Sequence, residues 1–422
     1  MGCSLSTLED VDQNRRIPKN VGELAVFVPG LRIPKPVNFS QSLGDNLSKS
    51  LIERLSGLRT RVVVLASQEA QTAVKPKRKA ATQHGGSMLS DLQQSLEDYL
   101  PVLLGLVKEG SKLQNSVKFV WVNQEDDTEE TAISNAWYEV LSVLHLMAMV
   151  SFSQANLSLL PKTSSDGYQQ TDESKRNSVD VFLKGAGYLD FALNHVLPQL
   201  PAELRKDLPV DLAEGVLQAL CQQALGQSVD IQLGMAIDCT KATLAVKQRL
   251  ACEMVKYWHQ VFIMHYSKQL TASREFAHDN IVKLPLTSGW GEKHQLYVKW
   301  KYDEAQAAAY YYHGLILDEG NTEKSHLMDV SSLRAAEEFH KEKKKECEAF
   351  HTTPPISKNP PIWGTMKYLS EKIAKDASSK GQINQDLYSH ERVIETAPVL
   401  PDLSVALKPD EYQLPPNDPL WN

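Results

Sequence analysis

The sequence predicts a mostly α-helical protein with an elongated body, and three observations favour this all-α fold class. Apolar residues recur every three or four positions through the long segments that follow residue 43, which is the spacing of one helix face. Short polar turns separate these segments, and strand-like alternation is rare after residue 122. Consecutive long helices with short connections are typical of a helical solenoid.

The N-terminal third combines short strands with two helices. Apolar residues surround a Pro29-Gly30 turn, and leucines at three- and four-residue spacing begin at Leu43. The expected elements are, in order, two short strands (24–34), a helix (43–73), a basic loop (75–87), a helix (91–109), a short strand (117–122) and an acidic loop (125–130). Strand patterns are thus concentrated in this part of the chain.

The rest of the chain is expected to be helical up to a proline-rich end. Residues 135–160 are apolar almost all round, which indicates a central helix packed on every side. Further helices are expected at 178–197, from Asp211 onwards, at 240–269, at 297–317, at 330–350 and at 363–375, with a polar loop at 163–176. Six prolines between Pro398 and Pro419 exclude a regular helix, so this arm lies along the helices or stays loose.

Composition narrows the range of partners. The 422 residues carry a net charge of −7, and 23% of them are charged. Because phosphate binding requires a basic face, this balance argues against nucleic acid as the main partner. The five cysteines lack paired spacing, which is typical of reduced thiols. The most apolar run, Val140 to Leu160, contains seven polar residues, so we expect no membrane-spanning helix.

The first six residues, Met1 to Ser6, carry a lipidation pattern. Removal of Met1 exposes Gly2, with Ser6 at the position that N-myristoylation favours. Cys3 lies beside it, where a thiol held at a membrane can be S-palmitoylated. One myristoyl chain binds a membrane only reversibly, so stable anchoring needs a second chain. The sequence therefore predicts a myristoyl group on Gly2 and a palmitoyl group on Cys3; the alternative is a chance Met-Gly start with an ordinary cysteine.

No catalytic, cofactor-binding or metal-binding motif is found. The phosphate loop, Gly-x-Gly-x-x-Gly, Gly-x-Ser-x-Gly, His-Glu-x-x-His and Cys-x-x-Cys patterns are all missing. We therefore expect no enzymatic activity, no cofactor, no metal and no small-molecule substrate. Two basic runs remain open to two interpretations: Lys75 to Lys79 and Lys341 to Glu346 are either solvated segments or contacts to anionic lipid, and the first could also be a nuclear signal.

Several stretches, in a fixed order, make the chain similar to the BRO-domain family, to which Alix and Brox belong. They are Asp98–Leu106, Ser111–Leu113, Val117–Trp121, Trp137–Ala155, Phe182–Tyr188, Leu197–Leu200, Lys299–Lys301, Ala309–Gly314, Leu333–Glu337 and Asn384–Ser389. The resemblance covers nearly the whole chain and is weaker before residue 90. It implies an elongated, curved helical solenoid with tetratricopeptide-like hairpins and a small N-terminal β-sheet.

The resemblance also implies a function. The family's shared activity is binding of the C-terminal amphipathic helix of a charged multivesicular body protein, a subunit of the ESCRT-III membrane-remodelling polymer. The chain is expected to divide into a lipidated segment (1–20), a BRO domain (21–405) and a proline-rich arm (406–422), and so to resemble Brox, a lone domain with a lipid. The implied role is an adaptor in endosomal sorting, anchored by lipid to the cytoplasmic face of the endosomal or plasma membrane, with a cytosolic pool.

The helix that begins at Asp211 is the expected site for the partner helix. Leu212, Val216 and Leu220 form a row at i, i+4 and i+8 with Leu217 beside it, as a groove for an amphipathic helix requires. The same row would equally suit a helix packed in the core. Gly226 and Asp230 lie in a segment that departs from the family pattern, which leaves open a scaffold that has lost ESCRT-III binding and serves other protein partners.

Overall fold

The computed structural model describes residues 27–74, 81–108, 110–124, 126–159, 162–164, 167–169, 172–270, 290–320, 323–354, 367–387, 397–404 and 406–421. Within these residues the α-helices are α1 (Phe39–Leu43), α2 (Lys49–Val74), α3 (Ala81–Leu104), α4 (Ala136–Leu159), α5 (Asp172–Phe191), α6 (Ala202–Lys206), α7 (Glu214–Asp238), α8 (Leu244–Leu270), α9 (Trp290–Asp318), α10 (Glu323–Thr352) and α11 (Lys367–Leu387). The strands are β1 (Arg32–Pro34), β2 (Phe119–Asn123), β3 (Asp126–Ile133), β4 (Lys162–Ser164) and β5 (Gly167–Gln169).

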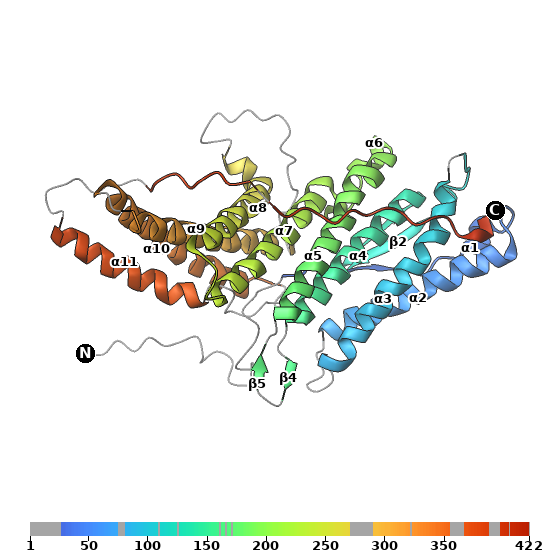
Figure 1. The fold of residues 1–422 in the computed structure, drawn as a ribbon. Coiled ribbons are helices and arrows are strands. Elements are labelled where there is room, and N and C mark those ends of the chain that lie inside the picture. Colours follow the sequence, from blue (N-terminus) through green and yellow to red (C-terminus); the bar gives the residue numbers. More distant parts are fainter. Residues whose placement is uncertain are drawn as a thin grey trace.

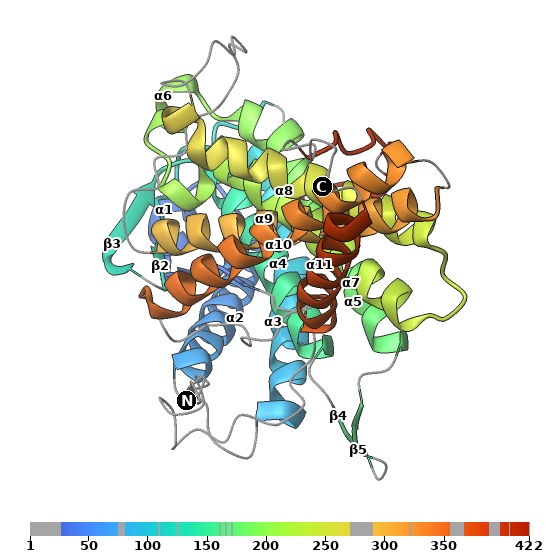
Figure 2. The same cartoon turned by 90° about the vertical axis from the view of Figure 1, so that its left-hand side faces the viewer.

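The long helices are stacked side by side in chain order, from α2 and α3 at one end to α10 and α11 at the other (Figure 1). Each packs mainly on its neighbours in this order: α4 on α5, α5 on α7, α7 on α8, α8 on α9, and α9 on α10. Figure 2 shows the stack from its α11 end. The expected fold class, an elongated and curved helical solenoid with a small N-terminal sheet, is confirmed.

Helix α4 is the core of the solenoid. Its side chains from Tyr138 to Phe152 are all buried, as its uninterrupted apolar pattern predicted. By length and composition alone α4 could cross a membrane, yet 78% of its apolar stretch is buried inside the fold. Its apolar surface is therefore satisfied by α3 and α5 rather than by lipid.

The three-stranded sheet has the order β1-β2-β3, with both pairs antiparallel. Trp121 of β2 points into the core and donates a hydrogen bond of 2.7 Å to Glu139 of α4. Pro34 lies opposite Trp121, at a position of β1 that needs no backbone N–H for the ladder, because the neighbouring Lys35 N–H donates to Val120. The sheet thereby fastens the N-terminal segment to the central helix.

Three expectations about local structure are corrected. The acidic segment at 125–130 is not a loop, since β3 spans Asp126–Ile133 and pairs with β2. Helix α3 begins at Ala81, so Gly85 and Gly86 lie within it; Lys75 to Ala80 lie outside the described residues. The polar segment at 163–176 contains the β4–β5 hairpin and the first turn of α5. In the two strand cases, pairing with a neighbouring strand overrode a polar local sequence.

Buried ion pairs join elements that are distant in the sequence. They are Arg32–Asp211, Arg59–Glu139 and Lys301–Asp230. Arg32 Nη1 lies 2.7 Å from Asp211 Oδ1 and Lys301 Nζ lies 2.6 Å from Asp230 Oδ2. A buried charge is tolerated only when it is paired and hydrogen-bonded, so each pair fixes the register between its two elements.

The proline-rich end forms an extended arm, residues 397–404 and 406–421, that runs back along the helix stack (Figure 1). On α8, Glu253 Oε1 accepts hydrogen bonds from the backbone N–H groups of Ala406 (2.6 Å) and Leu407 (3.0 Å). The Tyr257 hydroxyl donates to the Leu407 carbonyl at 2.7 Å. Of the two arrangements expected for this stretch, the structure shows the one that lies along the helices.

The arm continues across α5 to α2 and α3. Tyr412 packs edge-on against Tyr188 and Phe191 of α5, with ring centroids 4.8 and 5.3 Å apart. At the far end Asp418 pairs with Arg54 of α2 at 2.7 Å, and the Trp421 indole N–H donates to the Val102 carbonyl of α3 at 2.9 Å. One segment therefore contacts helices from α8, past α5, to α2 and α3 at one end of the solenoid.

Candidate functional site

The four residues expected to line a partner groove are all in the packed interior. Leu212, Val216, Leu217 and Leu220 are each 0% exposed. Val216, Leu217 and Leu220 lie on α7, which packs against α5 on one side and α8 on the other. Leu212 lies in the 3₁₀ turn Val210–Leu212, because α7 begins at Glu214 and not at Asp211 as expected. A row of leucine and valine is therefore covered by neighbouring helices, and the core interpretation of this row replaces the groove interpretation.

The two positions that departed from the family pattern have structural roles in α7. A Cβ on Gly226 would lie 3.0 Å from the Trp258 ring, so glycine lets α8 approach closely. Asp230 is the buried partner of Lys301 of α9. Both departures are explained by packing between helices, and neither creates an accessible surface.

Gly2 and Cys3, the expected lipidation sites, lie outside the described residues. Their acylation stays a prediction from the sequence.

A surface that the sequence did not single out lies on α9. From Lys293 to Leu317 no residue of this helix is fully exposed, although its neighbours α8 and α10 carry many exposed residues. One stripe of α9 is nevertheless partly exposed: Gln295, Lys299, Tyr302, Gln306, Tyr310 and His313. These residues follow one another at spacings of three and four and so lie on one helix face. We call this stripe the recessed face of α9.

Aromatic side chains dominate the recessed face and its borders. Tyr302 stacks on Phe262 of α8, with ring centroids 4.9 Å apart and planes inclined by 24°. Tyr310 stacks on Phe339 of α10 at 5.7 Å and 9°. All four rings are partly exposed, so each presents apolar area to a partner. Such large, stiff side chains supply contact area at a low cost in conformational entropy.

The border on α10 is acidic. Glu342 is exposed, and Glu346 forms an ion pair with Lys299 of the recessed face. Asp303 lies next to them, and burial raises its pKa to about 7, while Lys299 lowers it and Glu346 raises it. Asp303 Oδ2 has no hydrogen-bond partner. Glu342 is itself paired with Lys345 at 2.6 Å, so lysines balance the two glutamates of this border.

Two other polar groups on this face are held in their uncharged forms. Burial lowers the pKa of His313, whose Nδ1 lies 2.8 Å from Gln248 Nε2, so this imidazole is neutral near pH 7. Burial raises the pKa of Tyr302 to about 12, which keeps its hydroxyl protonated. Among the described residues no three histidine, cysteine or acidic side chains are grouped to hold a metal ion. The arrangement is suited to binding another chain.

Periodicity could not have distinguished this face. Helix α9 is buried by α7, α8 and α10 on its other sides, so nearly every position is apolar or paired and no single stripe stands out in the sequence. The one feature of the sequence that could have indicated this surface is the run Tyr310-Tyr311-Tyr312. Only Tyr310 of this run lies on the recessed face, and the other two are buried.

The fold is a helical solenoid with a small antiparallel sheet near its N-terminal end. A family model described as "BRO1-like domain" matches residues 36–406. Because this match covers most of the chain, the protein belongs to the BRO1-like domain family. A comparison with curated protein sequences finds no match.

Solved structures of this family share the fold. The chain is similar to ALIX in complex with the SIVmac239 PYKEVTEDL late domain, with a TM-score of 0.56, 15% identity and coverage of 93% of this chain. It spans 50% of that ALIX chain. The ALIX BRO1–CHMP4C complex gives the same TM-score of 0.56 and 15% identity, covering 93% of this chain and 98% of that one. A third structure, described as the "Structure basis for endosomal targeting by the Bro1 domain", has a TM-score of 0.55 and 13% sequence identity. The match covers 89% of this chain and 89% of that one.

Proposed function

We propose that this protein is a non-enzymatic adaptor that binds the C-terminal amphipathic helix of an ESCRT-III subunit and links it to a membrane in endosomal sorting. The observation that carries the proposal is the BRO1-like fold over residues 36–406, shared with an ALIX domain solved with CHMP4C. That likeness has 15% identity, so it concerns the fold, and the binding site is argued from this chain's own surface.

The recessed face of α9 is the proposed docking site. An amphipathic helix binds by laying its apolar side into a recess between helices, with anchors at i, i+3, i+4 and i+7. Tyr302 and Tyr310, on the same face of α9 with Gln306 between them, match anchors about two turns apart on such a ligand. Glu342 and Glu346 of the neighbouring α10 are paired with Lys345 and Lys299, so the aromatic anchors rather than charge carry the proposed recognition.

Membrane attachment is proposed to come from the N-terminus. A myristoyl group on Gly2 and a palmitoyl group on Cys3 would together hold the protein at the cytoplasmic face of an endosomal or plasma membrane. The only helix of the described part with the length and composition of a membrane span is α4, and it is buried. Lipid chains therefore account for attachment without disturbing the fold.

A peptide titration tests the docking site. A fluorescein-labelled peptide with the sequence of the CHMP4C C-terminal helix is titrated with the whole protein, and fluorescence anisotropy gives the dissociation constant. Gln306→Arg places a long cation between Tyr302 and Tyr310 on the solvent side of α9, and we expect binding to weaken at least about tenfold, or about 1.4 kcal/mol. Gln218→Arg is the matched control, because Gln218 is an exposed glutamine on α7, outside the recessed face.

Each outcome of this titration is informative. Weaker binding by Gln306→Arg with unchanged binding by Gln218→Arg supports the recessed face. Equal binding by both variants places the peptide on another surface. Absence of binding by the unmodified protein contradicts the proposed partner and favours the alternative, a BRO-fold scaffold that serves other proteins.

A further inference from the structure

Strand β3 is an edge of the three-stranded sheet. The order β1-β2-β3 leaves one side of β3 without a neighbouring strand among the described residues. This eight-residue strand is the longest of the described strands, which makes it an unusually long edge for such a small sheet. An edge strand presents unpaired backbone N–H and C=O groups that can pair with another chain.

The register identifies which backbone groups face outward. Lys35 N–H donates to the Val120 carbonyl, so the backbone groups of Val120 and Val122 point toward β1. The alternate residue Trp121 then pairs toward β3, opposite Thr131. It follows that the N–H and C=O groups of Glu130 and Ala132 point away from β2. No hydrogen bond from the described residues reaches them on that side.

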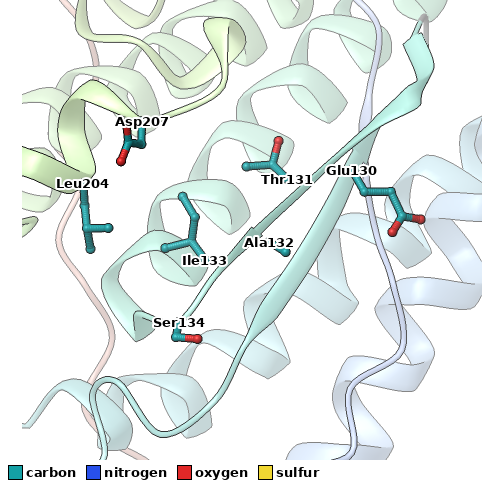
Figure 3. A pocket seen from close by; sticks show the side chains of 7 residues that line it. All are labelled: Glu130, Thr131, Ala132, Ile133, Ser134, Leu204 and Asp207. Carbon is teal, nitrogen blue, oxygen red and sulfur yellow. The ribbon is translucent and has the colours of Figure 1, made fainter.

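A hollow lies along this part of the strand. Its volume is about 610 Å³, and it is lined by Glu130, Thr131, Ala132, Ile133, Ser134, Leu204 and Asp207. Figure 3 shows Ile133 on the side of β3 that faces Leu204 of α6, while Glu130 projects to the other side. The hollow therefore offers a backbone edge, an apolar pair of side chains and two carboxylates.

Charge indicates the kind of chain that would fit. Four of the eight residues of β3 are acidic and none is basic, and the hollow adds Asp207. Lys35 lies 3.6 Å from Glu130, in an exposed pair that a basic peptide would compete with. Edge charges also protect a sheet from unwanted pairing. On β3, however, they end at Glu130, and the uncharged stretch from Thr131 to Ser134 is the part that lines the hollow. The end of β3 near Asp126 therefore carries acidic residues, whereas the end from Thr131 onwards has no charge that would oppose pairing with another strand.

We propose that the free edge of β3 binds an extended basic peptide segment of a partner protein, which adds a fourth strand to the sheet. The peptide's backbone would pair with Glu130 and Ala132, and its apolar residues would contact Ile133 and Leu204. Its lysine or arginine residues would be drawn to Glu130 and Asp207. Binding of this kind takes its affinity from main-chain hydrogen bonds and its specificity from alternate side chains. The site is separate from the recessed face of α9 and would allow two partners at once.

The test uses two peptides with the same side chains. One is a fluorescein-labelled hexapeptide of alternating lysine and valine; the other is its analogue methylated on every backbone nitrogen. The whole protein is titrated into each, and anisotropy is recorded at low salt. We expect the first peptide to bind and the methylated peptide to bind at least about tenfold more weakly, because its amides cannot pair with the strand. Hydrogen exchange should slow at Glu130 and Ala132 when the first peptide binds.

A pair of protein variants localises the binding. Ala132→Pro removes one outward N–H and no ladder bond, so the sheet should keep its fold while losing at least about tenfold in affinity. Ala132→Ser is the matched control and should bind as the unmodified protein does. Circular dichroism checks that both variants are folded. Equal binding of the two peptides, binding unaffected by Ala132→Pro, or no binding at all would overturn the proposal. So would concentration-dependent dimerisation that Ala132→Pro abolishes, since the edge would then serve a second copy of the chain.

Discussion

Asp303 is a carboxyl group held where charge is costly. It lies at the acidic border of the recessed face, 7% exposed, with Glu346 and Glu342 as acidic neighbours and Lys299 as the opposing cation. Burial is the largest cause that raises its pKa to about 7, far above the usual value near 3.8. The folded protein therefore retains a proton on Asp303 that the unfolded chain releases.

The raised pKa of Asp303 makes the stability of the fold depend on pH. Because the folded state binds the proton more tightly, Asp303 favours folding below its unfolded pKa, and this contribution is lost as the pH rises toward 7. We expect the free energy of unfolding, relative to an Asp303→Asn variant, to fall by about 2 kcal/mol between pH 5 and pH 8. Urea denaturation of both proteins at the two pH values measures it. Buried histidines such as His340, whose pKa is lowered to about 4, titrate in both proteins and cancel in the difference.

At the scale of single elements, the sequence predicted the helices better than the strands. The core of each long helix was evident from its apolar spacing, most clearly in α4 and α7, which bury most of their residues. Strand β3 was missed because its solvent-facing edge is acidic, and its place in the sheet depends on pairing with β2, which no local pattern encodes. The prediction that Leu212, Val216, Leu217 and Leu220 line a groove was wrong for a related reason. Sequence spacing shows which residues share a helix face, but it does not show whether a neighbouring helix covers that face.

The end of the arm gives a test at this scale. Gly105 follows α3, and a Cβ there would lie 1.9 Å from the Trp421 ring. Gly105→Ala should therefore displace Trp421, break its hydrogen bond to Val102 and loosen the last residues of the arm. We expect faster hydrogen exchange and faster proteolysis within residues 411–421, together with a loss of stability of about 1–3 kcal/mol.

Gly57 provides the matched control for this change. It lies within α2, and a Cβ there would meet nothing within 4 Å. Gly57→Ala should raise stability by about 1 kcal/mol, because alanine favours a helix more than glycine does, and should leave exchange in the arm unchanged. If hydrogen exchange in the arm is equally slow in both variants, the contact of Trp421 with Gly105 does not hold the arm in place.

At the scale of the whole molecule, the proposed adaptor separates attachment from recognition. The proposed lipidation sites Gly2 and Cys3 precede the described residues, whereas the recessed face belongs to α9, in the C-terminal half of the solenoid. We expect Gly2→Ala to move the protein from membranes to the cytosol, because palmitoylation of Cys3 follows myristoylation in this scheme. Cell fractionation measures the shift, and anisotropy with the CHMP4C peptide should give an unchanged dissociation constant. A Gly2→Ala protein that stays on membranes would show that a protein surface makes the attachment.

The arm also constrains how the protein can be made. It follows every α-helix that the structure describes, yet Tyr412 and Trp421 complete contacts on α5 and α3, which were synthesised long before. A growing chain folds from its N-terminus as it leaves the ribosome, so the helices must wait with Tyr188 and Glu253 uncovered until the last residues emerge. Chains truncated before the arm would leave this surface exposed, and chaperones and proteases would recognise it. Only chains translated to the end of the arm would complete the fold.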